Sequence, residues 1–197
     1  MYKINFLLLL LLSVLNGIYA QQKPMVFNHN ETALPGDAFN VQGSGWSKNV
    51  ELWGTVVKGN ENSLSPSFPI SADEGCVTGV FPLEMSYRKN VLIAVWVKEG
   101  ELYSEPFFLN RSRAVTMEFE EVMPGYVFRI FGRNLSLPGC KPIVTFIHPN
   151  SKQQHQAVVV KAEPYVLTVQ APFDLEAGTH YQVMVNNGAG GAYGNSL

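Results

Sequence analysis

Short stretches of β-branched and aromatic residues run through most of the chain and predict an all-β fold. They are separated by turn sequences such as Pro-Gly, Gly-Ser-Gly and Asn-Asn-Gly. After the first twenty residues, the apolar spacing of amphipathic helices is almost absent. Regular short strands with such turns are typical of an antiparallel β-sandwich or barrel. The predicted strands are residues 38–41, 50–57, 77–82, 91–97, 127–131, 143–147, 157–160, 165–169 and 181–185.

The first twenty residues follow a different pattern. Lys3 precedes an uninterrupted apolar run, residues 6–12, and the small residue Ala20 follows. These are the parts of a secretory signal peptide, here cleaved after Ala20. The apolar run is shorter than the ~20 residues that cross a bilayer, so a retained membrane anchor is the less favoured alternative. We therefore expect a secreted protein, periplasmic or extracellular, with no membrane span after cleavage.

An internal repeat divides the remaining chain. Residues 35–43, Pro-Gly-Asp-Ala-Phe-Asn-Val-Gln-Gly, match residues 124–132, Pro-Gly-Tyr-Val-Phe-Arg-Ile-Phe-Gly, 89 positions later. A second pair of similar segments, residues 95–100 and 183–188, is offset by 88 positions. Nearly equal offsets predict two homologous β-sandwiches, one in residues 21–110 and one in residues 111–197. A linker of only a few residues would make the pair a semi-rigid rod.

The shared pattern also predicts how each copy packs. Phe39 and Val41 alternate with polar residues and can enter a core, while Gly43 permits a bulge or a close backbone approach. Trp46 is then expected to fill the core.

The two copies differ at their ends. Residues 105–110 form a predicted closing edge strand in domain one, and residues 193–197 supply no equivalent. We therefore expect the second sandwich to lack its last strand. Either the polypeptide continues beyond residue 197, which is favoured, or another chain donates a strand.

The pattern Pro-Gly-x-x-Phe-x-(Val/Ile)-x-Gly resembles the opening of TIG/IPT-type immunoglobulin-like domains. With residues 103–106, 131–136 and 187–191, it is similar to the pair of Ig-like domains that precedes the right-handed β-helix of secreted bacterial pectate-lyase-like and glycoside-hydrolase-like proteins. In that family the β-helix carries the catalytic acids, and these residues contain no β-helix. The resemblance implies an accessory role beside a downstream domain of the same polypeptide, with polysaccharide as a candidate partner.

The net charge and the cysteine and histidine positions argue against several classes of function. Lys+Arg 14 and Asp+Glu 16 give a net charge of −2, too nearly neutral for an electrostatic hold on nucleic acid. Cys76 and Cys140 occupy non-equivalent positions of the repeat, so an interdomain disulfide and two reduced thiols both stay open. His148 and His155 flank a predicted turn, but no histidines have the spacing of a metal motif. We expect no enzyme activity, metal or cofactor in these residues.

Binding is the remaining class of function. Trp53 shares a strand face with Glu51, and Trp96 lies on the strand face opposite Val95. Exposed indoles stack on sugars or fill a partner's pocket, whereas buried ones pack under loops or against an adjoining domain. The sequence predicts a non-catalytic accessory segment of a polysaccharide-acting protein, with Trp53 and Trp96 as candidate binding residues. The alternative is a free-standing cell-surface or secreted adhesion protein completed by a donated strand.

Overall fold

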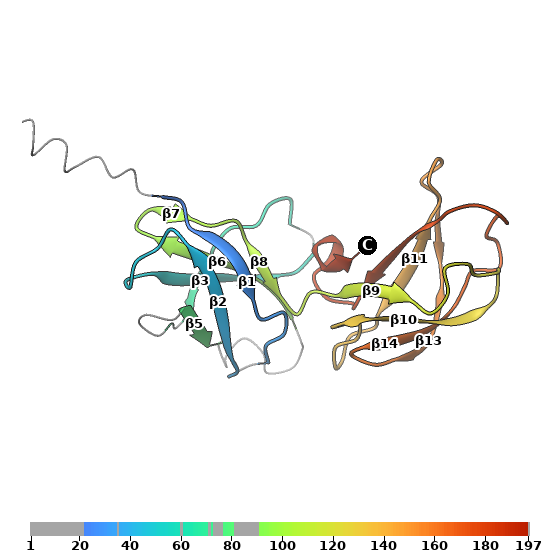
Figure 1. The fold of residues 1–197 in the computed structure, drawn as a ribbon, viewed down its shortest axis with the longest axis horizontal. Coiled ribbons are helices and arrows are strands. Elements are labelled where there is room, and N and C mark those ends of the chain that lie inside the picture. The colour runs from blue at the N-terminus through green and yellow to red at the C-terminus, as the bar shows by residue number, and fades with distance from the viewer. Residues whose placement is uncertain are drawn as a thin grey trace, which may run out of the picture.

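Two β-sandwiches follow one another along the chain and lie side by side (Figure 1). The structure is a computed structural model that describes residues 22–34, 36–59, 61–70, 72, 77–80 and 91–196. Strands β1 to β8 form the first domain and β9 to β16 the second, with residues 110–112 between them. The predicted all-β fold of two tandem sandwiches is confirmed.

The first domain consists of two antiparallel sheets. One has the order β1-β2-β5, and the other has the order β4-β3-β6, with β7 and β8 both paired to β6. The strands are β1 (Met25–His29), β2 (Ala38–Ser44), β3 (Glu51–Val57), β4 (Phe68–Ile70), β5 (Val77–Val80), β6 (Leu92–Glu99), β7 (Leu102–Tyr103) and β8 (Phe107–Leu109).

The second domain repeats this plan, with β13 added to its first sheet and β16 in place of β7 and β8. Its sheets have the orders β13-β14-β10-β9 and β12-β11-β15-β16. This strand order is that of immunoglobulin-like sandwiches, in which consecutive strands cross between two sheets in a Greek key. The elements are β9 (Arg113–Met117), β10 (Val127–Arg133), β11 (Ile143–Ile147), β12 (Gln154–Gln156), β13 (Val158–Ala162), β14 (Val166–Gln170), β15 (Gln182–Asn186), the 3-10 helix η2 (Gly191–Gly194) and β16 (Asn195–Ser196).

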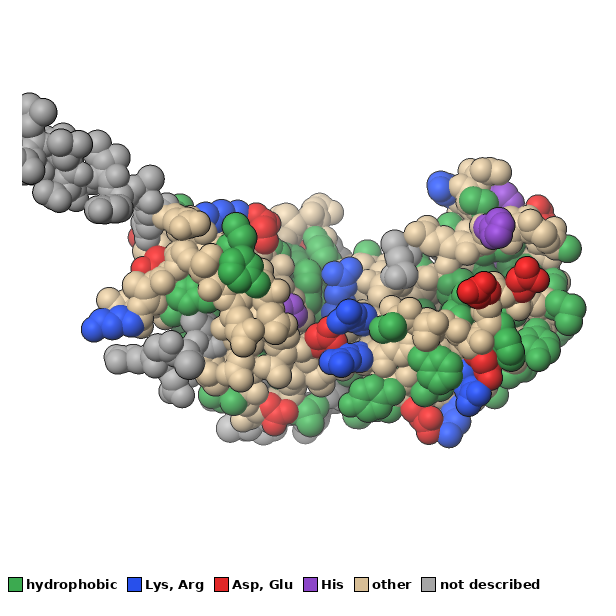
Figure 2. All heavy atoms as spheres, viewed as in Figure 1, with side chains coloured by type: hydrophobic (Ala, Val, Ile, Leu, Met, Phe, Trp, Pro, Cys, Tyr) green, Lys and Arg blue, Asp and Glu red, His purple; other side chains and the backbone are tan. Residues whose placement is uncertain are grey.

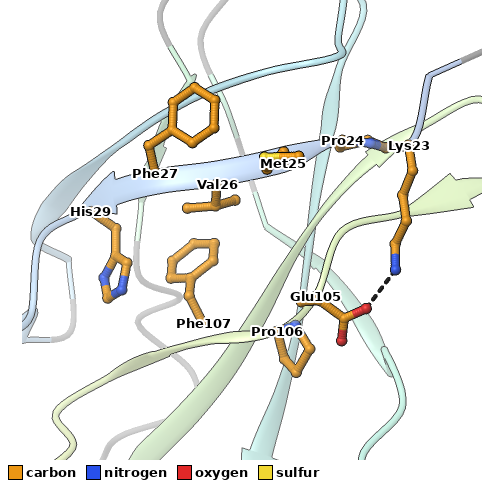
Figure 3. A pocket seen from close by; sticks show the side chains of 9 residues that line it. All are labelled: Lys23, Pro24, Met25, Val26, Phe27, His29, Glu105, Pro106 and Phe107. Atoms are coloured by element: carbon orange, nitrogen blue, oxygen red, sulfur yellow. Dashed lines mark hydrogen bonds and ion pairs between the residues drawn. The ribbon is translucent and has the colours of Figure 1, made fainter.

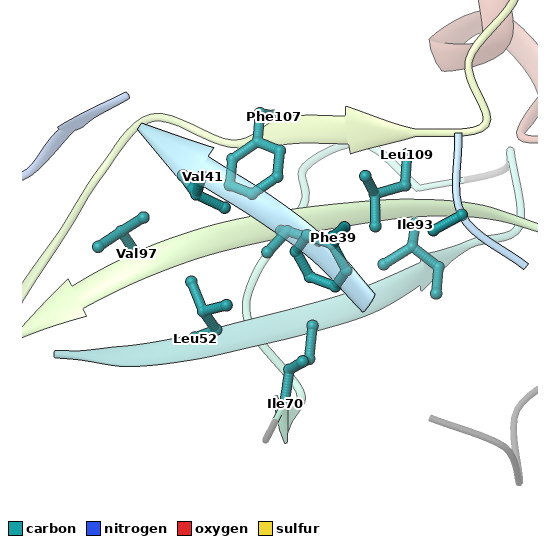
Figure 4. Packing of buried hydrophobic residues seen from close by; sticks show 10 residues of the cluster. Phe39, Val41, Leu52, Ile70, Ile93, Val97, Phe107 and Leu109 are labelled. Atoms are coloured by element: carbon teal, nitrogen blue, oxygen red, sulfur yellow. The ribbon is translucent and has the colours of Figure 1, made fainter. Parts of the chain in front are cut away.

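The repeated nine-residue pattern builds the centre of each core. In β2, Phe39 and Val41 are buried among the side chains shown in Figure 4 while their neighbours in the strand are exposed. Phe128 and Ile130 of β10 are buried in the second core in the same way. A Cβ at Gly43 would lie 2.2 Å from the ring of Trp46, so the glycine lets that indole pack against the first core, as the sequence predicts.

Strand β6 is buried on both of its faces. Ile93, Val95 and Val97 point into the first core. Leu92, Ala94 and Trp96 point the other way and are equally buried, in a cluster that includes residues of the second domain. A continuous apolar run is the sequence signature of a strand covered on both sides.

All nine strands predicted from the apolar runs overlap an observed strand, and the predicted closing strand of residues 105–110 contains β8. Six further strands of the described residues were not predicted, namely β1, β4, β7, β9, β12 and β16. In β1 and β9 the burial pattern is exposed-intermediate-exposed-exposed-intermediate, because a bulge interrupts the register of each with its partner. A bulge breaks the alternation that identifies a strand from its sequence. The end of the strand predicted at residues 77–82 lies partly outside the described residues.

The second domain has only a short last strand within the described residues. Strand β16 pairs Ser196 with Val185 and Asn195 with Asn186. In the first domain, the equivalent edge of β6 is covered by both β7 and β8. No described helix is long and apolar enough to span a membrane.

Candidate functional site

The junction between the two domains contains a buried apolar cluster. The first domain supplies Val57, Leu92, Ala94 and Trp96 from the outer face of the β3-β6 sheet. The second domain supplies Leu137 and Ala189 from the loops after β10 and β15, together with the partly buried Cys140 and Tyr193. The ring of Tyr193 stacks on Phe108 with centroids 6.3 Å apart. Buried residues of both domains therefore form one continuous apolar cluster.

A fully buried asparagine ties the loops of the junction together. Asn187 has 0% of its surface exposed, and its side-chain amide donates to the backbone oxygens of Asn110 (2.8 Å) and Asn134 (2.9 Å). Its Oδ1 accepts a hydrogen bond from the amide of Ala189 (3.1 Å). One side chain therefore holds the interdomain link and two loops of the second domain. Both amide hydrogens and the Oδ1 of Asn187 are hydrogen-bonded and shielded from water.

Asn110 and Asn134 themselves form the next layer of this network. Both adopt left-handed backbone conformations, with φ of 69° and 51°, which asparagine tolerates better than most residues. The amide of Asn134 donates to the backbone oxygens of Glu31 (3.0 Å) and Arg111 (3.2 Å). The Asn110 side chain both accepts from and donates to the backbone of Ala33. The side chains of these two asparagines thus connect the loop that follows β1 to the link between the domains.

Asn110 and Asn134 each begin an Asn-x-Ser sequence of the kind recognised for N-glycosylation. They are 2% and 5% exposed, and their amide nitrogens donate hydrogen bonds within the protein. An attached oligosaccharide is incompatible with this packing, so these two sites are structural in the folded protein. The third such residue, Asn30, is exposed.

Glycines allow the two backbones to meet. A Cβ at Gly59 would lie 2.6 Å from the backbone nitrogen of Gly191, and a Cβ at Gly190 would lie 2.2 Å from the side chain of Leu92. The glycine-rich loop of residues 188–191 therefore serves close contact between the domains.

Charged residues surround the edge of the junction, where Figure 2 shows basic side chains gathered between the two domains. Glu31 forms ion pairs with Arg113 and with Arg133 (3.6 Å). Arg111 donates two hydrogen bonds to the backbone oxygen of Asn195 (2.9 and 3.1 Å) and lies over the ring of Phe108. Exposed pairs of this kind contribute little energy individually but add orientation to the interface.

The structure places the two candidate tryptophans side by side with different exposure. Trp53 and Trp96 are directly opposed on β3 and β6 and therefore share the outer face of the sheet. Trp96 is 5% exposed and packs in the interdomain cluster, so it offers no ring face to a ligand while the domains are joined. Trp53 is half-buried beside it.

Polar neighbours hold Trp53 in place. Its indole N–H donates to Glu51 (2.7 Å), and the Lys98 ammonium lies 5.4 Å from the ring centroid. The hydrogen bond from Trp53, followed by the contact with Lys98, holds the pKa of the Glu51 carboxyl below its ordinary value although partial burial opposes the shift. The tryptophan keeps part of its surface accessible and is the remaining candidate for contact with a sugar.

Two histidines flank Tyr181 at the other end of the second domain. The rings of His148 and His155 meet the Tyr181 ring edge-on, with centroids 5.6 and 5.8 Å away. The imidazole of His155 is hydrogen-bonded to Asp174 (2.8 Å), and His148 lies 3.5 Å from Glu176. Both histidines of this hairpin therefore contact the same tyrosine ring. No set of three His, Cys, Asp or Glu side chains among the described residues is arranged to hold a metal ion.

Sequence reasoning missed the residues that organise the junction. The sequence identified Trp96 as a candidate binding residue but assigned no role to Asn187, because the partners of a buried amide are fixed only by the fold. The available signals were the apolar faces of residues 91–97 and the three asparagines at turns after strands. Cys140 lies half-buried in the junction, and Cys76 lies outside the described residues.

No protein-family model matches this sequence, and no curated protein matches it either. Among solved structures, the chain is similar to the FN1–FN3 domains of chicken CNTN1, with 16% identity and a TM-score of 0.29. The match covers 89% of this chain and 65% of that one. The strand order and the registers of the two sheets in each domain are those of an immunoglobulin-like fold.

We expect Asn187→Ala to destabilise the junction more than either core. The substitution leaves two buried backbone oxygens without their donor, which costs about 2–4 kcal/mol. Calorimetry should show the wild-type protein unfolding in one transition and the variant in two. The matched control is Asn28→Ala, because Asn28 makes an exposed side-chain hydrogen bond to Gln42 and its loss changes stability by less than about 0.5 kcal/mol. A single unchanged transition in Asn187→Ala would contradict this account.

We expect Asp174 to make the second domain sensitive to acid. The hydrogen bond from His155 lowers the pKa of the Asp174 carboxyl in the folded state. A lowered pKa stabilises the fold above the ordinary aspartate pKa of about 3.9, and this contribution is lost as the pH falls below that value. Urea unfolding midpoints measured from pH 7 down to pH 3 should fall less steeply for Asp174→Asn than for wild type. Parallel curves would show that the pair does not contribute.

Proposed function

We propose that residues 22–196 form a non-catalytic, semi-rigid segment that spaces and orients another part of the same exported polypeptide. The observation that supports this most is the junction itself: Trp96 and Leu137 are buried between the domains, and Asn187 bridges the link. A flexible tether needs no such interface, since interdomain mobility is the default for small polar contacts. A fixed angle between two sandwiches is useful to a protein that must hold something at a set distance.

The sequence resemblance supports a secreted protein that acts on a polysaccharide as the setting of these two domains. The repeated Pro-Gly-x-x-Phe pattern resembles TIG/IPT-type domains, and the paired arrangement resembles the Ig-like domains that precede a β-helix in secreted bacterial pectate-lyase-like proteins. In this proposal residues 1–20 direct export, and a downstream domain acts on a polysaccharide. The pair of sandwiches then positions that domain relative to its substrate.

Contact with the polysaccharide itself is assigned to Trp53 alone. Trp96 has no accessible ring face, whereas Trp53 remains half-buried on the same outer sheet face, next to the exposed carboxylate of Glu51. The indole of Trp53 can stack on a sugar ring, and the neighbouring Glu51 carboxylate can accept hydrogen bonds from the sugar hydroxyls.

We expect the two domains to share one orientation in solution. Residual dipolar couplings measured by NMR should fit a single alignment tensor for both domains of the wild-type protein. Leu137→Asp places a charge in the buried junction and should require two different tensors, because an unpaired charge there is more stable in water. Val158→Asp, on an exposed edge strand, is the control and should keep one tensor. Two tensors in the wild type would contradict the positioning function.

We expect Trp53→Ala to abolish retardation of the protein in gels that contain soluble plant polysaccharide. Loss of one stacking indole removes most of the contact energy of a small binding surface. Phe27→Ala, which alters another exposed aromatic residue of the same domain, should migrate as the wild type does. Equal migration of the wild type and Trp53→Ala would remove the sugar contact from the proposal and leave the positioning role to be judged by the couplings.

A further inference from the structure

Strand β9 runs away from the first domain (Figure 1). A groove opens beside the end of β9 and the start of β15. Its apolar residues include Met117 of β9, Phe146 of β11, and Tyr181 and Val183 at the start of β15. The charged side chains of Glu120, Glu121 and Glu176 also line it. Its volume is about 550 Å³. Met117, Tyr181 and Val183 belong to the second core but are only partly buried, because they also face this groove.

The internal repeat gives two residues of the groove, Met117 and Val183, counterparts in the first domain. Met117 lies opposite Ile130 in the β9–β10 pair, just as His29 lies opposite Val41 in the β1–β2 pair. Both pairs contain a bulge at the same point in their register. His29 is therefore the counterpart of Met117.

The counterpart of Val183 follows from the pairing in the other sheet of each domain. Val185 lies opposite Val144, just as Val97 lies opposite Leu52. Two residues earlier along each strand, Val183 is the counterpart of Val95.

In the first domain, the side chain of Phe107 occupies the space between these counterparts. Phe107 lies opposite Val95 in the β6–β8 pair and is 6% exposed. Its ring centroid is 4.6 Å from that of His29 and 6.5 Å from that of Phe39. Figure 3 shows the Phe107 ring from β8 pointing toward Val26 and His29 of β1. The groove of the second domain lies at the matching position.

The backbone beside the groove is open as well. Within the described residues, Gln182–Met184 of β15 pairs with β11 on one side, and β16 covers only Val185 and Asn186 on the other. Strand β16 runs antiparallel to β15, so an extended chain that continued from Ser196 would pass Met184 and then Val183. An open strand edge next to an apolar groove is the arrangement that binds an added strand.

We propose that this groove is an acceptor site for an extended strand that continues from β16 and inserts one large apolar side chain between Met117 and Val183. The site rests on the proposed function, in which further residues of the same polypeptide follow the two domains. The strand pairs with Gln182–Met184 through backbone hydrogen bonds, and its apolar side chain completes the second core as Phe107 completes the first.

The test uses the first domain's own strand as the probe. The sequence Pro-Phe-Phe-Leu-Asn of residues 106–110 is added after Leu197, which keeps the three-residue spacing between Ser104 and Phe107 when counted from Ser196. We expect the midpoint of the protein's unfolding transition to rise by at least about 5 °C. Backbone amides of Gln182–Met184 that point away from β11 should exchange with solvent about tenfold more slowly. The matched control is the same tail with alanine in place of its first phenylalanine, and it should lose most of both effects.

Two results would overturn the proposal. The first is an equal midpoint and equal amide exchange for the chain with the phenylalanine tail, the chain with the alanine tail and the chain without a tail. The second is tight binding of a free peptide of residues 104–110 by a chain whose attached tail has no effect, which would identify a strand donated by another molecule. Neither result affects the single alignment tensor expected of the chain without a tail, so failure of the strand site and failure of the positioning function are distinguishable.

Discussion

The buried side chain of Asn187 is the interaction on which the arrangement of the two domains depends. It donates to the backbone of the link at Asn110 and to the loop at Asn134, and it accepts from Ala189 in the loop that reaches the first domain. A buried amide with every partner satisfied specifies one geometry, because any shift leaves a polar group without its partner in a medium that cannot replace it. The apolar side chains around it supply attraction, and the amide network supplies orientation.

The same junction explains why β6 is apolar on both faces. Its inner face, with Ile93 and Val95, belongs to the core of the first sandwich, and its outer face, with Leu92 and Trp96, belongs to the cluster between domains. The first domain alone would expose this outer face to water, which would favour association with another surface. Pairing with the second domain covers it, so the two sandwiches are better regarded as one structural unit than as separate modules on a tether.

The fold followed from the sequence more completely than the site did. The alternation of Phe39 and Val41 with polar residues, and its repetition 89 positions later, was sufficient to predict two sandwiches and their centres. Bulged strands such as β1 and β9 escaped prediction because a bulge removes the alternation. The role of Trp96 stayed open between a ligand platform and an interdomain contact, since strand periodicity assigns a face but not what covers it. The hydrogen-bond partners of Asn187 could not be predicted from its position at a turn, because they lie 53 and 77 residues away in the sequence.

The most direct test of a fixed junction is native-state hydrogen exchange of its buried amides. The backbone N–H groups of Ala33, Asn110 and Ala189 are hydrogen-bonded within the junction, to Asn110, Glu31 and Asn187 respectively. If the two sandwiches form one unit, these amides should exchange only on global unfolding, as slowly as those at the centre of β6 and β11. Exchange of the junction amides orders of magnitude faster than that of the cores, in the intact protein, would contradict a fixed arrangement of the two domains.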